Sequence, residues 1–277
     1  MTDTGWFADV AVGDPDAAGD AVREGRADAP DDWPALAVDA GVADDEDEYY
    51  ALLREATVAG TRAAARERER ADDQQLVHAV RAMADLSDAA NEVAERAVEW
   101  AGSLFEDVDA GVEGARAVAD REPETLAEER AVSLCQRAAD LADERERVRE
   151  FVEAQAPAVA PNLSMLADPV LAARLIALAG ALEALAKMPS GTVQVLGAED
   201  ALFAHLRGHA PSPKHGVIYT HEYVRGTHPE ERGSAARALA GKLSIAARVD
   251  HYAGDRRPEL RDELDERMER IRAREHE

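Results

Sequence analysis

The stretch LVHAVRAMADLSDAANEVAERAVEW, residues 76–100, carries the clearest periodic pattern in this chain of 277 residues. Apolar or small residues recur along it at alternating steps of three and four, as in the seam between two helices that pack lengthwise. The seam positions are Leu76, Ala79, Met83, Leu86, Ala90, Val93, Ala97 and Trp100. The spacing therefore predicts a long helix with one apolar stripe.

A second stretch, residues 131–152, carries the same pattern. Its seam positions are Ala131, Leu134, Ala138, Leu141, Arg145, Val148 and Val152. Residues 101–130 contain the Gly and Pro typical of a turn followed by a helix restart. The two stretches predict a long antiparallel helical hairpin over residues 73–156. Such a hairpin is either the core of a bundle or a coiled coil that pairs with a second copy of the chain.

The rest of the chain also predicts a mainly helical fold. Aromatic residues make up 4% of the chain while Ala, Leu and Val are abundant, a balance that favours helices over sheet sandwiches. A small α/β domain is expected at residues 1–72, because WFADVAV (6–12) and WPALAV (33–38) are candidates for short strands. A helix is expected from Tyr49 to about Arg70.

Two prolines interrupt the hairpin pattern near residue 157 and mark the start of a second helical domain, residues 157–252. Its expected helices cover about 169–187, 197–207 and 229–249. Residues 211–228 join the last two helices as a loop, with a short strand at GVIYT (216–220) as one option. The tail, residues 253–277, predicts a charge-laced helix exposed to solvent.

Charge is distributed unevenly along the chain, whose formal net charge is −25. Residues 1–159 contain 16 Lys and Arg against 40 Asp and Glu, whereas residues 160–250 contain 9 against 8. The many acidic residues and the scarcity of Lys are typical of halophiles, in which concentrated salt screens an acidic surface. A segment without this excess of acidic residues is either a surface for an anionic partner or a more buried part of the fold.

The sequence lacks the motifs of the common enzyme classes and of metal sites. It contains no glycine-rich nucleotide loop, no HExxH, no nucleophile elbow and no CxxC. The histidines between residues 209 and 228 are six or seven positions apart, which is not a usual spacing for metal ligands. We therefore expect no catalytic residues and no metal.

Targeting signals are also missing from the sequence. The first ten residues show no signal-peptide pattern, and the most apolar run, residues 170–188, is interrupted by three charged residues. The single cysteine, Cys135, forms no internal disulfide, which fits a reducing compartment. We expect a cytoplasmic protein with no membrane span.

Four specific motifs follow one another along the second half of the chain. They are APNLSML (160–166), LAARLIALAGALEALAKMPSGTVQVLGAEDALFAHL (171–206), PKHGVIY (213–219) and ARALAGKLSIAARVD (236–250). On these motifs the chain resembles the archaeal Nop-family core protein of box C/D small ribonucleoproteins. The resemblance covers roughly residues 156–252, and the preceding hairpin and the YYALLREATVAGTRAA helix (49–64) stand where the family has them.

The resemblance implies a scaffold that is not itself an enzyme. In that family the N-terminal domain docks a fibrillarin-type methyltransferase, and the coiled coil pairs two copies. The Nop domain binds box C/D guide RNA together with a kink-turn-binding ribosomal-type protein. The complex methylates ribose 2′-hydroxyls, with S-adenosylmethionine on the methyltransferase and no cofactor on this chain. The dimerisation seam would comprise Leu76, Met83, Leu86, Val93, Trp100, Leu134, Leu141 and Val148.

Basic side chains of the second half are the candidates for contact with RNA and its bound protein. They are Lys187, Arg207, Lys214, His215, Arg225, Arg232, Arg237 and Lys242. The family's RNA-contacting helix corresponds to residues 197–206, where Asp200 and Ala204 replace basic residues of the family. Phe203 is expected in the core, and Arg248 in packing or a salt bridge.

Two other functions compete with the scaffold. A methyltransferase activity of the chain itself would need alternating strands and helices with a glycine loop, and these patterns are missing. The other alternative is a coiled-coil oligomerisation protein with no role in RNA binding, in which residues 211–226 are an internal crossover loop.

Overall fold

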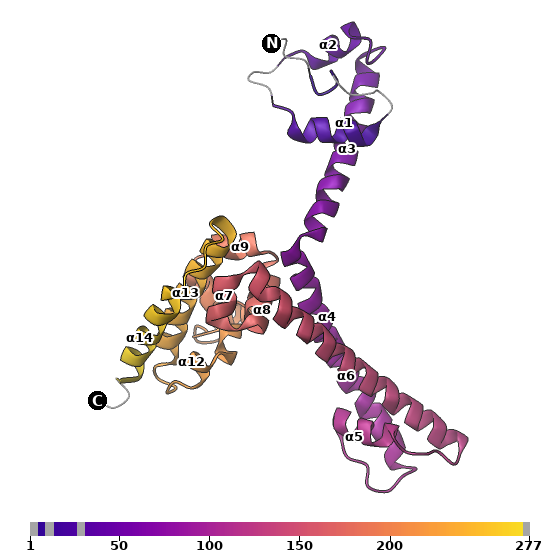
Figure 1. Cartoon of the computed structure of the whole chain (residues 1–277), viewed down its shortest axis with the longest axis vertical. Coiled ribbons are helices and arrows are strands. Elements are labelled where there is room, and N and C mark those ends of the chain that lie inside the picture. The colour runs from indigo at the N-terminus through magenta and orange to yellow at the C-terminus, as the bar shows by residue number, and fades with distance from the viewer. Residues whose placement is uncertain (1–4, 9–13, 27–30, 274–277) are drawn as a thin grey trace. The chain divides into compact units, whose positions relative to one another are not determined.

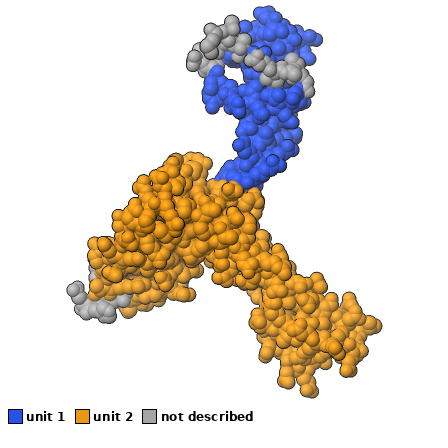
Figure 2. Space-filling model, viewed as in Figure 1, with its two compact units in different colours: residues 1–71 blue, residues 72–277 orange. Residues whose placement is uncertain are grey.

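The computed structural model describes residues 5–8, 14–26 and 31–273, in two compact units, residues 1–71 and 72–277 (Figure 2). Within the described residues every regular element is helical (Figure 1), which confirms a mainly helical fold. Unit 1 contains α1 (Pro15–Glu24), α2 (Trp33–Asp39) and α3 (Glu46–Arg70). Unit 2 contains α4 (Asp72–Gly102), α5 (Gly111–Ala119), α6 (Leu126–Val159), α7 (Pro161–Ala167), α8 (Pro169–Ala179), α9 (Leu182–Lys187), α10 (Ser190–Val195), α11 (Glu199–Leu206), the 3-10 helix η1 (Val217–Thr220), α12 (Glu222–Arg225), α13 (Arg232–Tyr252) and α14 (Glu259–Ala273).

The expected strand at residues 33–38 is wrong, because these residues form α2. The Asp32 carboxylate accepts a hydrogen bond from the Ala35 amide at 3.3 Å, and Pro34 lies in the first turn. An Asp cap followed by Pro is a strong helix start, and it outweighs the alternation of apolar residues. The other expected strand, residues 6–12, extends outside the described residues, and its first part forms a turn.

Unit 1 has a small aromatic core and one close helix crossing. Phe7 and Tyr49 are buried in an edge-to-face contact, with ring centroids 6.2 Å apart. Helices α1 and α3 cross at Gly19 and Gly60, where a Cβ added to Gly19 would lie 2.5 Å from the Gly60 nitrogen. Glycine at this crossing therefore allows the two backbones to touch.

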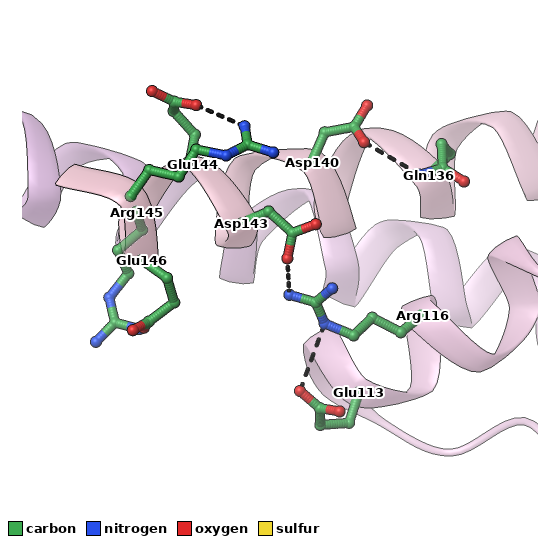
Figure 3. A network of polar contacts seen from close by, with 9 residues as sticks. Glu113, Arg116, Gln136, Asp140, Asp143, Glu144, Arg145 and Glu146 are labelled. Atoms are coloured by element: carbon green, nitrogen blue, oxygen red, sulfur yellow. Dashed lines mark hydrogen bonds and ion pairs between the residues drawn. The ribbon is translucent and has the colours of Figure 1, made fainter. Parts of the chain in front are cut away.

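Helices α4 and α6 form the expected antiparallel hairpin, and α5 packs against both at its far end (Figure 1). A capping box starts α6, in which the Thr125 hydroxyl accepts from the Glu128 amide and the Glu128 carboxylate accepts from the Thr125 amide. Arg116 of α5 donates to Asp143 of α6 at 2.5 Å (Figure 3). This ion pair lowers the pKa of Asp143 and fixes α5 on the hairpin.

The buried layer of the hairpin contains the expected Ala90 and Ala97, but at the other two positions near the tip it is displaced by one residue. Toward the tip it runs through Ala90, Ala94, Ala97 and Ala101, so it leaves the predicted Val93 half-buried and Trp100 42% exposed. Small side chains let the two backbones approach closely, and a straight helix drifts from a strict seven-residue repeat. Leu76 is fully buried. The other seam candidates, Met83, Leu86, Leu134, Leu141 and Val148, are half-buried.

Helices α7 to α14 surround the main core of unit 2, and their boundaries correct three expectations. The helix expected over residues 169–187 is broken at Gly180, which adopts the left-handed conformation with φ 88°. The option of a strand at 216–220 is wrong, because Val217–Thr220 is a 3-10 helix. Helix α14 is not a freely solvated tail, since it lies along α13 (Figure 1) and four of its apolar side chains are buried. They are Leu260, Leu264, Met268 and Ile271.

The Asp250 carboxylate near the end of α13 is a long-range anchor of this domain. It accepts hydrogen bonds from the Asn162 and Leu163 amides at 3.0 and 2.8 Å and from the Asn162 side-chain amide at 2.6 Å. Helix α7 has no side-chain cap of its own, so Asp250 serves as its cap from 88 residues away. Asn162 in turn binds the Asp255 carbonyl and the Arg257 amide, which fixes the turn between α13 and α14.

No single helix in the described part of the chain is long and apolar enough to cross a membrane. Helices α7 and α8 pass that test of length and composition only as a pair, bent by 116° at their junction.

Replacing Asp250 with Ala should lower the free energy of unfolding by about 2 to 4 kcal/mol, because three N–H donors lose their acceptor at a buried helix start. Denaturant unfolding at constant salt measures this change. The exposed Asp255, in the adjacent turn, provides the matched control, and Asp255→Ala should change the free energy by less than about 0.5 kcal/mol. Equal effects of the two variants would contradict the anchoring role of Asp250.

Candidate nucleic-acid interface

Residues 214–217 form a loop held against the end of α10 by backbone contacts. The Gly216 and Val217 amides donate to the carbonyls of Gln194 and Leu196 at 2.9 and 2.8 Å. The Gln194 side chain donates back to the Lys214 carbonyl at 2.7 Å. A Cβ at Gly216 would lie 2.0 Å from the Leu196 oxygen, so this position must be glycine for the loop to lie this close. The loop therefore has one fixed shape.

The fixed loop builds a layered stack of three side chains. The His215 and Tyr219 rings lie parallel, with centroids 4.5 Å apart and planes inclined by 22°. The Arg232 guanidinium lies 5.5 Å from the centroid of the Tyr219 ring. Lys214 extends toward the start of α13, where a Cβ on Gly233 would lie 3.9 Å from the Lys214 Cδ. We call Lys214, His215, Tyr219 and Arg232 the loop cluster.

Arg232 also ties the loop cluster to the turn before α13. Its Nε donates to the Thr227 carbonyl at 3.1 Å, and its Nη2 to the Arg225 carbonyl at 3.4 Å. Thr227 is buried and its hydroxyl donates to the Tyr223 carbonyl at 2.7 Å. These bonds orient the guanidinium, and no carboxylate of the described residues pairs with it, so none of them neutralises its positive charge.

Partial burial lowers the pKa of His215, and the charges of Arg232 and Lys214 act in the same direction. The ring is therefore neutral at neutral pH, and its nitrogens can donate one hydrogen bond and accept another. A neutral stacked ring beside the held Arg232 guanidinium and the exposed Lys214 side chain suits a partner that offers both anionic oxygens and hydrogen-bonding edges. RNA phosphates and bases have this combination.

His221, six residues further on, is a structural histidine. Its Nε2 lies 3.0 Å from the Leu166 carbonyl, and its Nδ1 accepts from the Tyr223 amide at 3.1 Å as the cap of α12. The ring is therefore neutral, with the proton on Nε2. Burial lowers its pKa, because a charged imidazolium would lose both solvation and the bond to Tyr223.

Comparison with known proteins assigns the family. The Nop family model, described as "snoRNA binding domain, fibrillarin", matches residues 67–271. This chain belongs to the Nop family. The match includes the hairpin and extends through most of α14, and it contains the loop cluster.

The Nop chain is similar to curated relatives over a limited part of their length. It is 50% identical over 132 residues to an uncharacterized NOP5 family protein of Methanocaldococcus jannaschii, which covers 48% of this chain and 32% of that protein. It is 42% identical over 120 residues to nucleolar protein 56 of Saccharomyces cerevisiae, which covers 43% of this chain and 24% of that protein. The matched region thus spans about a quarter to a third of these relatives.

A solved structure resembles the Nop chain over nearly its whole length. It is the crystal structure of a fibrillarin/Nop5p complex, and one of its chains aligns with a TM-score of 0.55 at 25% identity. The alignment covers 97% of this chain and 99% of that chain.

The remaining candidate residues of the Nop domain do not belong to the loop cluster, and among them the Arg225 carbonyl accepts a hydrogen bond from Arg232. Lys187 is exposed and pairs with Glu183 one turn earlier on α9. Arg207 and Arg225 are exposed at the ends of α11 and α12. Arg248 is structural, because its guanidinium donates to the last carbonyls of α9, at Ala186 and Met188. These donations satisfy the end of α9.

Arg237 and Lys242 follow Arg232 along α13 but face a different side. Five residues of α-helix correspond to about 140° of rotation, so Arg237 points away from the loop cluster. Lys242 forms an ion pair with Glu263 of α14. The structure thus separates the eight candidates into a loop cluster, a set on α13 and isolated side chains.

Helix α11 of the Nop domain is more exposed than the sequence predicts. The expectation that Phe203 belongs to the core is wrong, because its side chain is 55% exposed and its neighbour Leu206 is 70% exposed. No residue of α11 is buried. The short helix packs too little for its apolar residues to be covered.

Sequence reasoning missed Tyr219 and Gln194, which hold the loop cluster together. Tyr219 stands four residues after His215, a spacing that could have indicated a contact, but the segment was treated as a loop. Gln194 gave no signal, because its bond to Lys214 depends on the fold.

Among the described residues no group of three or more His, Cys, Asp or Glu could hold a metal ion.

The pKa of His221 predicts a pH dependence of stability. The folded-state pKa lies below the unfolded value of about 6.5, so the unfolded chain binds the proton first as pH falls. The free energy of unfolding should therefore decrease as pH falls below about 6.5. His221→Asn keeps a helix-capping side chain and should show a smaller decrease over the same range.

Urea unfolding between neutral and mildly acidic pH measures this difference. Part of the slope remains in His221→Asn, because His215 shifts in the same direction. Parallel profiles of the variant and the wild type would show that burial of His221 makes no such contribution.

Proposed function

We propose that this chain is the scaffold subunit of a box C/D guide ribonucleoprotein that directs ribose 2′-O-methylation of RNA in the cytoplasm. Residues 157–252 bind guide RNA together with a kink-turn-binding ribosomal-type protein. Residues 1–72 dock a fibrillarin-type methyltransferase, and residues 73–156 pair two copies of the chain. S-adenosylmethionine binds the methyltransferase, and this chain acts by positioning the partners.

The loop cluster is the observation that carries this proposal. Lys214 and Arg232 present two cations on a chain of net charge −25, beside a neutral stacked ring, and two hydrogen bonds to backbone carbonyls hold the Arg232 guanidinium. Acidic residues at this surface would repel RNA phosphates. A negatively charged partner therefore explains why the segment contains so few Asp and Glu residues. Family membership supports RNA as that partner.

Contact with a joint surface of RNA and protein suits a chain that works in concentrated salt. Salt removes most of the free energy that counterion release gives to phosphate binding, so phosphate pairs alone would be weak. Stacking, shape and hydrogen bonds depend less on salt. The loop is already ordered in the free chain. Binding through it therefore costs little conformational entropy.

The other two roles rest on different observations. The similar chain of known structure comes from a fibrillarin/Nop5p complex and aligns over 97% of this chain, including its N-terminal region. For pairing, the hairpin leaves Leu86, Leu134 and Leu141 half-buried although they stand at seam positions. A second hairpin could cover these side chains.

Replacing Lys214 with Glu should weaken the complex with kink-turn RNA and its bound protein by about 1 to 3 kcal/mol, because a carboxylate then faces phosphates. Interferometry titrations in molar KCl, with and without the kink-turn protein, measure the change. Arg256→Glu carries the same charge change in an exposed turn and should have little effect. If both variants assemble as tightly as the wild type, the loop cluster is structural only.

Replacing Leu86 with Asp should shift the chain from dimer to monomer, since a carboxylate at the paired seam costs roughly 2 to 4 kcal/mol. The half-buried position lets the monomer remain folded with the carboxylate in water. Sedimentation at high salt measures the mass. Ala84→Asp places the same charge on an exposed face of α4 and should leave the dimer intact. If Leu86→Asp dimerises as strongly as the wild type, this seam is not the dimer interface.

A further inference from the structure

A groove of about 460 Å³ lies between α13 and α14, on a different side of α13 from the loop cluster. Its floor follows one face of α13 through Ser234, Ala238 and Gly241. The spacing of four and three keeps these residues on one face of the helix, and their small side chains keep the groove open. A Cβ added to Gly241 would meet nothing within 4 Å, so the centre of the groove is accessible.

The lining of the groove is positive, in contrast to the chain as a whole. Arg237 and Lys242 line it from α13 and Arg267 from α14, and no carboxylate belongs to the lining. Lys242 forms an ion pair with Glu263. Neither Arg237 nor Arg267 pairs with any carboxylate of the described residues, and both are exposed. Two guanidinium groups are therefore available at one groove without a partner from the chain.

We infer that this groove binds phosphate groups of the RNA backbone, with Arg267 of α14 as a contact that no sequence motif indicated. A guanidinium offers paired N–H donors that match the oxygens of a phosphate. The open floor admits the backbone, Ser234 offers a hydroxyl, and Ile245 at the edge, 40% exposed, offers an apolar surface for a ribose. The inference rests on the proposed function, and it adds a second phosphate contact beyond the loop cluster.

The packing of α14 gives this role a physical basis. Leu264 and Met268 are buried on either side of Arg267 in the sequence, and they fix the helix on α13. Arg267 lies on the exposed face between them and so is held near Arg237. A helix that did not pack on α13 would not hold Arg267 near Arg237.

The test uses the full chain, the kink-turn protein and a kink-turn RNA with an extended stem, titrated over a series of KCl concentrations. Arg267→Ala should weaken the complex about three- to tenfold and lower the slope of log Kd against log salt by about one, as for loss of one phosphate contact. Arg267→Lys should keep the slope, because the charge remains. Arg256→Ala, which removes one charge outside the groove, should change neither.

The outcomes separate the inference from the proposed function. If the wild type assembles and Lys214→Glu weakens it while Arg267→Ala behaves like Arg256→Ala, the groove does not contact RNA and the scaffold role stands. If Arg267→Ala instead changes the mass of the chain without RNA, the groove binds a second copy and the inference is wrong. If the wild type does not assemble with RNA at all, both are wrong.

Discussion

The hydrogen bonds between Asp250 and the start of α7 are the constraint on which the helical domain depends. They join the last residues of α13 to the first residues after the hairpin, 88 positions earlier in the chain. Burial raises the pKa of Asp250, and the three N–H donors oppose that shift. A half-buried carboxylate with these bonds is stable only where its partners are in place, so it specifies one arrangement of α7, α13 and the turn to α14.

The same helix carries the anchor at one end and the candidate interface at the other. Asp250 fixes the C-terminal end of α13, while Arg232 at the N-terminal end closes the loop cluster over Tyr219. Gly216 adds a second constraint, because its contact with Leu196 leaves no room for a side chain. The positive charges are therefore presented on rigid elements, which reduces the ordering cost of binding.

The sequence predicted the helical class and the hairpin because both depend on local periodicity. It also named Lys214, His215 and Arg232 as candidates for RNA contact, and that assignment stays a prediction. The predictions from sequence were wrong where contacts in the folded chain determine the structure. Residues 33–38 form a helix capped by Asp32 and not a strand. Near the tip of the hairpin alanines are buried in place of two larger seam residues, because close packing favours small side chains.

Other features could not be predicted from the sequence, since they depend on contacts between distant residues. The bond from Gln194 to Lys214 and the groove between α13 and α14 join segments that no local pattern connects. Phe203 was misplaced because an apolar residue in a helix is usually buried, whereas α11 has too few contacts to cover it.

Reconstituted methylation tests the central claim most directly. The assay combines guide RNA, target RNA, the kink-turn protein, the methyltransferase and S-adenosylmethionine, and measures methyl transfer to the target ribose in molar KCl. The account predicts transfer with the wild-type chain and with Gly191→Ala, where a Cβ meets nothing within 4 Å, and strongly reduced transfer with Gly216→Ala. Equal transfer when the chain is left out would contradict the scaffold role.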